Sequence, residues 1–255
     1  MNKLEICALA SGSNGNCYYI GNDHEAVLVD AGLSARQLQM RMHACGLDPA
    51  KIKAILVTHE HSDHCCGVRV LSKRLGGIPV YLTKKTYLAM HRKQQPGLVV
   101  WFEPNQEFPI GSFSIFPFSK QHDAADACSF RISYDGRHVG VMTDIGEPCE
   151  QVRLHFSMCH AVFLESNYDE DMLWSGPYPY YLKQRVSSSV GHLSNIQAFR
   201  LLESCAGGSL KMVLLSHLSG ENNTPEKAIS VFESLQQSYC IELTSRQAPT
   251  RVFVV

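Results

Sequence analysis

The segment 58–64 carries the densest set of metal-binding side chains in the chain. It reads Thr-His-Glu-His-Ser-Asp-His, so three imidazoles and two carboxylates fall within six residues. These two kinds of ligand together suit zinc, manganese or iron. Because alternate residues of an extended loop point the same way, His59 and His61 can share one cation. Asp63 and His64 lie just beyond and can face a second, so the motif predicts a metal-dependent hydrolase.

Such a site needs more ligands than one loop offers, and three candidates lie far away in the sequence. Each follows an apolar run that ends a few residues before it: His122, Asp144 and His217. Taken singly, each residue fits a structural role equally well. Loops at strand ends are where rigid scaffolds mount chemistry, so the shared context favours all three as ligands.

The elements that must position these residues alternate between strand-like and helix-like segments. Strands are expected at 4–8, 17–20, 26–29, 52–57, 80–82, 113–118, 128–134, 138–142, 161–164 and 211–215, and near 241 and 252. Helices are expected at 34–46, 68–75, 84–93, 194–205 and 224–237, three of them beginning at a capping residue. No linker or repeat divides the chain, so the pattern predicts one α/β domain over residues 1–255.

Composition limits what the protein can bind and where it works. The 255 residues carry a formal net charge of −1, which argues against binding nucleic acid by bulk charge. An anionic substrate must therefore be held by a local patch or by bound metal. No apolar run is long enough to span a membrane, and the first ten residues show no secretory leader. With ten scattered cysteines and no C-x-x-C pair, we expect a cytoplasmic protein with mostly buried free thiols; its oligomeric state is not defined.

The order H-x-H-x-D-H, His122, Asp144, His217 resembles the metallo-β-lactamase superfamily, from about Ser11 to Thr224. An aspartate at position 144 is similar to the ribonuclease Z and glyoxalase II branches. Asp30-Ala31-Gly32 matches a D-x-G motif, in which we interpret Asp30 as a loop anchor and not as a ligand. The resemblance implies a four-layer αββα sandwich with the site at one edge.

The resemblance also implies roles for the ligands and for two further residues. The first of two divalent cations (zinc, manganese or iron) would be held by His59, His61 and His122. The second would be held by Asp63, His64 and His217, with Asp144 bridging both and Asp63 orienting the attacking water. His192 would assist the leaving group, oriented by Glu165, because a carboxylate-backed imidazolium can donate a proton. The alternative is that His192 only bonds backbone at a helix start.

Two segments are candidates for holding substrate. The loop 11–16, with Ser11, Ser13 and Asn16, could form a backbone nest for a phosphate, or it could be a plain hairpin turn. In the segment 178–185, aromatic residues beside Lys183 and Arg185 could stack bases and pair with phosphates. The same segment fits an amphipathic helix that covers the site equally well.

Segments 178–195, 11–13 and 216–219 resemble the YycJ/WalJ group of this superfamily. That resemblance implies a 5′→3′ exonuclease on double-stranded DNA, in which a hydroxide shared by the two metals attacks phosphorus. Only 48 positions separate Asp144 from His192, which leaves no room for a β-CASP insert. Two alternatives stay open: a hydrolase of small esters, thioesters, lactones or cyclic phosphodiesters, and a non-catalytic, metal-binding regulatory protein.

Overall fold

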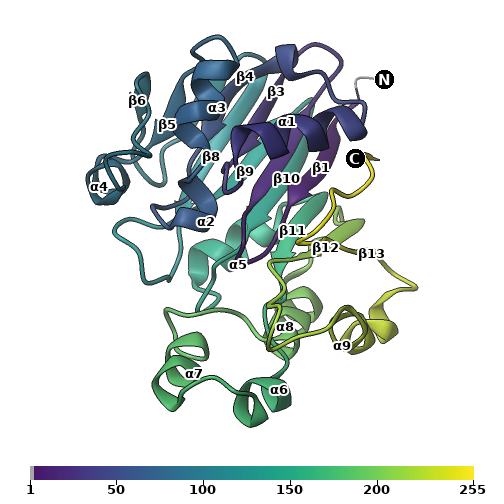
Figure 1. The fold of residues 1–255 in the computed structure, drawn as a ribbon. Helices are drawn as coiled ribbons and strands as arrows, with labels where there is room; N and C mark the ends of the chain where they lie inside the picture. Colours follow the sequence, from purple (N-terminus) through teal and green to yellow (C-terminus); the bar gives the residue numbers. More distant parts are fainter. Residues whose placement is uncertain (1–2) are drawn as a thin grey trace.

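Two mixed, seven-stranded sheets form the centre of the computed structural model, which describes residues 3–255 (Figure 1). Sheet A consists, in order, of β14 (Phe253–Val254), β1 (Glu5–Ala10), β2 (Cys17–Gly21), β3 (Ala26–Val29), β4 (Ile52–Leu56), β5 (Val80–Leu82) and β6 (Val99–Trp101). Sheet B consists, in order, of β13 (Cys240–Leu243), β12 (Met212–Ser216), β11 (Ala161–Glu165), β10 (Arg137–Met142), β9 (Cys128–Tyr134), β8 (Phe113–Ser119) and β7 (Phe108–Ile110). Each sheet is antiparallel in one part and parallel in the other.

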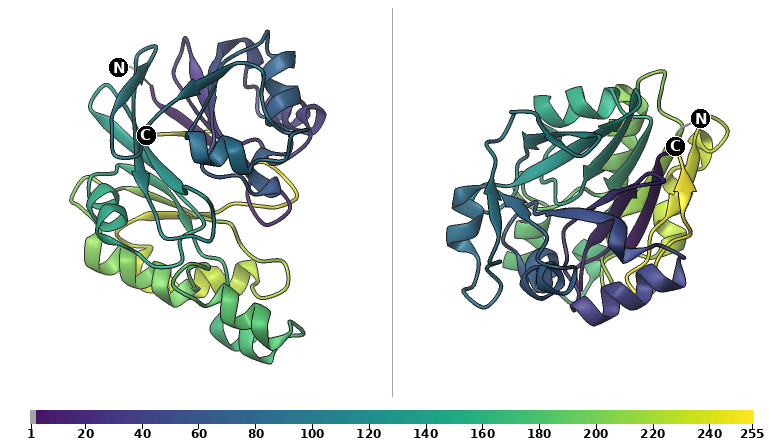
Figure 2. Two further views of the ribbon diagram at one scale, coloured as in Figure 1. Left: turned by 90° about the vertical axis from the view of Figure 1, so that its left-hand side faces the viewer. Right: turned by 90° about the horizontal axis from the view of Figure 1, so that it is seen from above.

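Helices cover the outer face of each sheet, as the two views of Figure 2 show. Sheet A carries α1 (Ala35–Ala44) and α3 (Val68–Arg74). Sheet B carries α5 (Glu150–Ser157), α8 (Asn195–Cys205) and α9 (Pro225–Val231). The connections contain α2 (Ser62–Cys65), α4 (Lys84–Ala89), α6 (Glu170–Ser175), α7 (Tyr180–Val186) and 3₁₀ turns at Pro49–Lys51 and Glu233–Leu235. The predicted four-layer αββα order is therefore present.

Three apolar cores hold the four layers together. Because side chains alternate along a strand, Val27 and Val29 face sheet B, while Leu28 faces the helices on the other side of sheet A. Between the sheets, the rings of Tyr18 and Phe163 lie 4.8 Å apart. A third core lies between sheet B and its helices. Strands buried on both faces explain the near-continuous apolar runs of the sequence.

Some helices differ from their predicted extents. The helix predicted at 84–93 ends at Ala89, because the Gln95 amide donates to the carbonyls of Tyr87 and Met90 and closes the last turn. The helix predicted at 224–237 ends at Val231 and continues only as the 3₁₀ turn after the buried Phe232. Helices α5 and α6 and strands β6 and β7 were not predicted.

The ends of several strands meet at one edge of the sandwich. In sheet A the loop after β4 starts there, and in sheet B the ends of β8, β10, β11 and β12 lie there. Near this edge three residues turn the chain through left-handed backbone conformations: Asp30 (φ 62°) directly after β3, Asp144 (φ 55°) two residues after β10, and His217 (φ 58°) directly after β12. Such conformations cost about 1–3 kcal/mol each and cluster at functional sites. None of the described helices is long and apolar enough to cross a membrane.

Candidate metal centre

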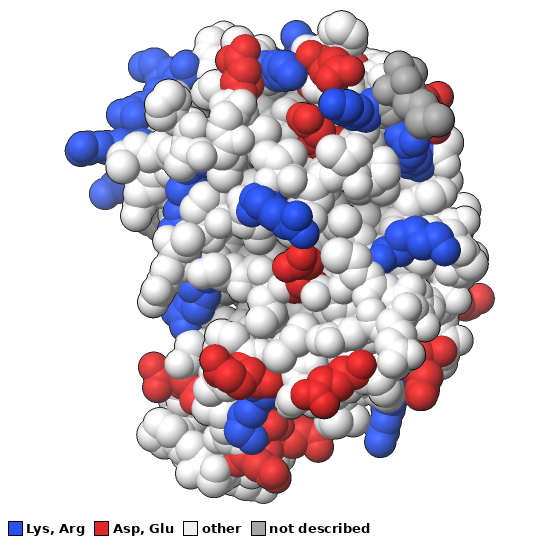
Figure 3. All heavy atoms as spheres, turned by 90° about the vertical axis from the view of Figure 1, so that its right-hand side faces the viewer, with Lys and Arg blue, Asp and Glu red and all other residues white. Residues whose placement is uncertain are grey.

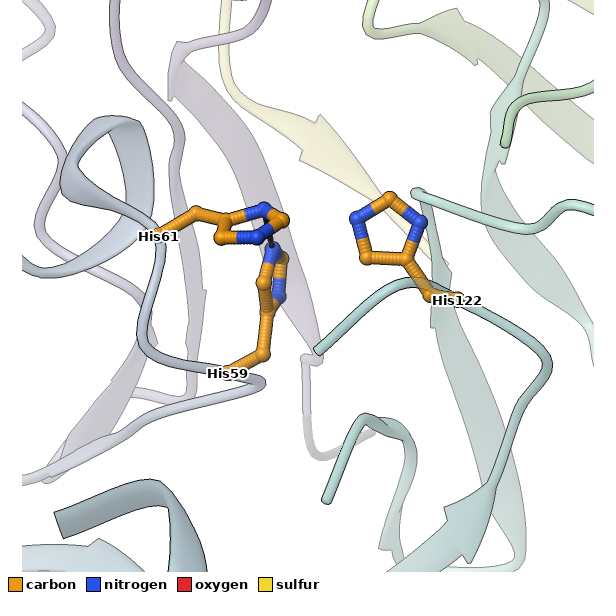
Figure 4. A group of neighbouring side chains, drawn as sticks. All are labelled: His59, His61 and His122. Carbon is orange, nitrogen blue, oxygen red and sulfur yellow. Dashed lines mark hydrogen bonds between the residues drawn. The ribbon is translucent and has the colours of Figure 1, made fainter. Parts of the chain in front are cut away.

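His59, His61 and His122 converge from two different sheets (Figure 4). His59 and His61 follow β4, and His59 Nε2 lies 3.1 Å from His61 Nδ1. His122 follows β8, and its ring lies 4.9 Å from that of His59 and 5.2 Å from that of His61. One nitrogen atom from each residue lies within 4.8 Å of the other two. The structure thus brings together the three side chains predicted for the first cation.

A second group lies beside the first. His64 Nε2 lies 3.4 Å from Asp63 Oδ2, and His217 Nε2 lies 3.6 Å from the same oxygen. Asp144 lies between the two groups, with Oδ2 3.2 Å from His64 Nε2 and Oδ1 3.9 Å from His122 Nε2. All seven predicted ligands therefore meet at one place, in the predicted grouping. That they hold metal in these roles stays a prediction.

Hydrogen bonds behind the site determine which nitrogen of each histidine faces inward. Asp30 Oδ2 accepts from the Thr58 hydroxyl (2.8 Å) and from His64 Nδ1 (2.7 Å). Since the hydroxyl proton of Thr58 goes to Asp30, its oxygen accepts from His59 Nδ1 at 2.9 Å. Both histidines therefore present Nε2 to the site, as metal-bound imidazoles with a carboxylate or hydroxyl partner do. Asp30 has the loop-anchoring position that we interpreted from its motif.

Sheet B orients its histidines in the same way. His122 Nδ1 donates to the carbonyl of Gly191 at 3.1 Å, and His217 Nδ1 donates to Glu165 Oε1 at 3.0 Å. The Nε2 atoms of both rings and Asp144 Oδ2 are buried without a hydrogen-bond partner among the described residues. Buried polar atoms normally have a hydrogen-bond partner. Three unpartnered nitrogen and oxygen atoms that lie together therefore fit the ligands of a bound cation.

The electrostatics of the site also favour positive charge. Burial disfavours ionisation of Asp144, yet His217 and His64 hold the pKa of its carboxyl well below the usual value. Burial likewise favours a neutral His217, but Asp144, Asp63 and Glu165 raise its pKa to about 10. Burial dominates at His122 and lowers its pKa to about 4. The carboxylates thus favour positive charge at His217, and a bound cation would supply positive charge there in place of a proton.

Glu165 links the predicted ligands to His192. Its Oε1 accepts from His192 Nδ1 at 2.8 Å, and its Oε2 accepts from the amides of Ile145 (2.7 Å) and Leu193 (3.2 Å). Burial alone would raise the pKa of Glu165, but His192 and His217 lower it to about 2, so the carboxylate is ionised. The His192 side chain is 22% exposed, which leaves its Nε2 accessible from outside.

Of the predicted substrate contacts, Ser11 and Asn16 lie behind the site. Ser11 is buried, and its hydroxyl accepts from the amide of His217 at 2.7 Å. Asn16 is buried, with Nδ2 3.0 Å from His64 Nε2. Ser13 is exposed. The amides of Gly12 and Asn16 donate to Asn16 Oδ1 and Asp63 O, which favours the turn over a phosphate nest.

Lys183 and Arg185 lie on α7, which forms the helix that was the alternative for this segment. Lys183 Nζ donates to the carbonyl of Trp174 at 2.7 Å. Arg185 Nε pairs with Asp123 at 2.6 Å, next to the predicted ligand His122. Whether either residue contacts substrate stays a prediction.

Two functional positions were missed by sequence reasoning. Thr58 donates a hydrogen bond to Asp30 and accepts one from His59, so it links the two residues. Its position directly before the histidine motif was the sequence feature that could have indicated this role. Lys120 is buried beside the site and donates to the carbonyl of Thr143 at 2.7 Å, which ties the loop after β8 to the loop after β10. No sequence pattern indicated that a lysine would be buried there.

Residues 25–217 match the family described as the Beta-lactamase superfamily domain, and this stretch includes all seven predicted ligands. The chain belongs to this superfamily and is a metal-dependent hydrolase, whose histidine and aspartate clusters indicate divalent metal binding.

The relatives named exodeoxyribonuclease match most of the chain. It is 32% identical to "Exodeoxyribonuclease YycJ" of Bacillus anthracis over 98% of both chains. It is 35% identical to "Exodeoxyribonuclease WalJ" of Streptococcus pneumoniae over 86% of this chain and 83% of that one. The crystal structure of the metallo-β-lactamase fold protein YhfI from Bacillus subtilis shares the fold, with a TM-score of 0.75 at 16% identity over 99% of this chain and 100% of that one.

Proposed function

We propose that this protein is a dinuclear metal-dependent exonuclease that degrades double-stranded DNA from the 5′ end. The observation that carries the proposal is the match to an exodeoxyribonuclease over 98% of the chain, supported by the seven predicted metal ligands that lie together. The 5′→3′ polarity rests on the resemblance to the YycJ/WalJ group alone. The cytoplasmic location expected from the sequence belongs to the same proposal.

Each predicted ligand would have a role set by its position. His59, His61 and His122 would hold one cation and Asp63, His64 and His217 the other, and Asp144 would contact both. When bound, two divalent cations activate water as a nucleophile and stabilise the charge of a phosphoryl group. Zinc, manganese and iron all suit this mixture of nitrogen and oxygen ligands.

Asp63 and His192 are the groups that reach the substrate side. The Asp63 side chain is 23% exposed, whereas those of Asp144 and Glu165 are almost fully buried. Asp63 can therefore accept a hydrogen bond from the attacking water and align it. Nδ1 of His192 donates a hydrogen bond to Glu165. When the ring is an imidazolium, its Nε2 can donate a proton to the leaving 3′-oxygen.

Binding of DNA must depend on local groups, because the net charge is only −1. On the face drawn in Figure 3, basic side chains are scattered and acidic side chains gather toward the lower end. Because the net charge supplies no bulk attraction, bound metal ions would be the main attraction for a phosphodiester, assisted by single cationic side chains.

The test is digestion of a 5′-phosphorylated duplex with added manganese, combined with elemental analysis of the protein. We expect nucleotides to be released from the 5′ end, Asp63→Ala to abolish turnover, and His192→Ala to slow it by roughly 10²–10⁴-fold, the share of a positioned acid. His43→Ala, which removes an exposed histidine of α1, serves as the matched control and should not change the rate. Hydrolysis of thioesters or lactones without any DNA degradation would refute the proposal.

A further inference from the structure

A cavity of about 420 Å³ lies beside the loop that follows the predicted ligand His217. Its lining includes residues 218–220 of that loop and residues 243–247. The volume falls within the usual range for small-ligand sites. None of the predicted metal ligands or substrate contacts lines this cavity, so the roles assigned so far do not explain it.

Arg246 is the cationic group that lines this cavity. Its Nε donates to Asn14 Oδ1 at 3.2 Å. Across residues 3–255, no carboxylate oxygen lies within 4.0 Å of its guanidinium, whereas Arg251 pairs with Glu242 and Arg185 with Asp123. A guanidinium presents five N–H donors in a fixed fork that matches phosphate, so Arg246 has donors left for a ligand.

The side chain of Arg246 occupies space that is left free by two glycine residues, Gly12 and Gly220. A Cβ atom at Gly12 would lie 2.4 Å from Arg246 Cγ, and one at Gly220 would lie 1.5 Å from Arg246 Nη1. The side chain therefore lies between the loop 11–16 and the loop after His217, in space that any other residue at these two positions would fill. The Ser-Gly-Ser-Asn-Gly-Asn turn thus positions a cation in place of forming a phosphate nest.

A second arginine, Arg41, forms hydrogen bonds to the backbone around Arg246. Arg41 donates from Nη1 to the carbonyl of Leu9 at 2.8 Å, and from Nη2 to those of Gln247 (2.8 Å) and Arg246 (3.3 Å). The amide of Ser11 adds a bond to the carbonyl of Ser245 at 3.2 Å. The loop with Arg246 is therefore tied to β1 and to the loop that positions His217, so the guanidinium keeps a set relation to the metal centre.

We infer that Arg246 and the cavity beside it bind a phosphate group of the substrate strand other than the phosphate that is cleaved. This rests on the proposed function, because a second phosphate exists only in a nucleotide chain. The ligand is either the terminal 5′-phosphate or an internal phosphodiester; both have the same charge-assisted chemistry toward a guanidinium. Arg246 is a binding residue in this assignment and takes no part in proton transfer.

The test compares wild type, Arg246→Met, Arg246→Lys and the control Arg251→Met, all loaded with metal. Steady-state kinetics are measured on a 5′-phosphorylated duplex, on the same duplex with a 5′-hydroxyl, and on bis(p-nitrophenyl) phosphate, which has one phosphate only. Binding is measured separately, by anisotropy of a 3′-labelled duplex whose terminal linkages are slowly cleaved phosphorothioates, as a function of salt.

For Arg246→Met we expect KM on phosphorylated duplex to rise about 10- to 100-fold, the share of one charged hydrogen-bonding partner. The loss on duplex should exceed the loss on bis(p-nitrophenyl) phosphate by at least about tenfold by the same reasoning. The slope of log affinity against log salt should fall by about one. Arg246→Lys should keep the salt slope but recover only part of the affinity, and Arg251→Met should match wild type.

The two duplexes separate the sources of phosphate. A defect that disappears with the 5′-hydroxyl duplex assigns the cavity to the terminal phosphate, and an equal defect on both assigns it to an internal one. Wild-type KM and salt slope in Arg246→Met, with DNA digestion intact, would overturn this inference alone. A wild-type enzyme that cleaves bis(p-nitrophenyl) phosphate but no DNA would overturn the proposed function as well. If Arg246→Met has a lower Tm than wild type, the KM of Arg246→Lys, which keeps the aliphatic part of the side chain, decides the outcome.

Discussion

Replacing Glu165 with glutamine isolates the contribution of one buried charge to the whole centre. The carboxylate accepts four hydrogen bonds: from His192 (2.8 Å), His217 (3.0 Å), Ile145 N (2.7 Å) and Leu193 N (3.2 Å). All four partners are donors. An amide has only one oxygen, and its nitrogen atom would face two of these donors whichever way the group is turned.

The magnitude follows from that mismatch. Two buried donors lose their acceptor at about 1–3 kcal/mol each, so we expect Glu165→Gln to be destabilised by about 2–6 kcal/mol. For a chain of this size that corresponds to a fall in Tm of roughly 5–20 °C. If the amide nitrogen faces His217, metal affinity should also fall, by about 10- to 100-fold, the usual effect of removing the partner of a metal-bound histidine.

Thermal unfolding and competitive metal titration measure the two effects. Glu147→Gln is the matched control, because Glu147 lies two residues after Ile145 and is exposed, and it should behave as wild type. A Glu165→Gln protein with wild-type Tm and wild-type metal affinity would show that the four hydrogen bonds do not hold the centre in place, and the reasoning would fail.

Three further predictions follow from other parts of the structure. Gly32→Ala should lose most of its bound metal in elemental analysis, because its Cβ would lie 1.6 Å from the Asp63 carbonyl oxygen, whereas Gly97→Ala meets nothing within 4 Å and should keep it. Burial against Phe116 and Phe118, together with the charge of Arg131, lowers the pKa of His155 to about 4. The stability that the neutral His155 ring contributes is therefore present above the unfolded pKa and is lost as the pH falls from 6.5 to about 4. In urea unfolding, His155→Phe should therefore lose less stability than wild type between pH 7 and 4, by at most about 3 kcal/mol. Chelation should lower Tm, since ligands from both sheets lose their common partner, and a Tm unchanged by complete metal removal would contradict this.

The predictable part of the site was the part that short sequence segments encode. The histidine motif lies in one short segment, which runs from the loop after β4 into α2, and His122, Asp144 and His217 each follow a strand whose apolar run marks its end. Strand ends of one sheet meet at a common edge, so position in the sequence predicts convergence in space. The structure places all of these side chains together.

What the sequence did not reveal depends on contacts between distant segments. Glu165 was expected to orient His192, but it also orients His217, which requires the neighbouring parallel strands β11 and β12 to end level with each other. Helix α5 begins at Glu150, and the side chain of its N-cap residue Cys149 makes no capping hydrogen bond, so no start signal was present. Arg246 lies in an irregular segment, and only the fold brings it beside the loop that follows His217.

The division of the predicted ligands between the two sheets links metal binding to the packing of the sheets. The motif with His59, Asp63 and His64 follows β4 of sheet A, whereas His122 and His217 follow strands of sheet B. Neither sheet alone provides either predicted ligand set. A chain whose sheets have not yet packed together therefore has no complete site with which to trap an unsuitable ion, and metal choice is left to the folded protein and to the pool of ions that surrounds it.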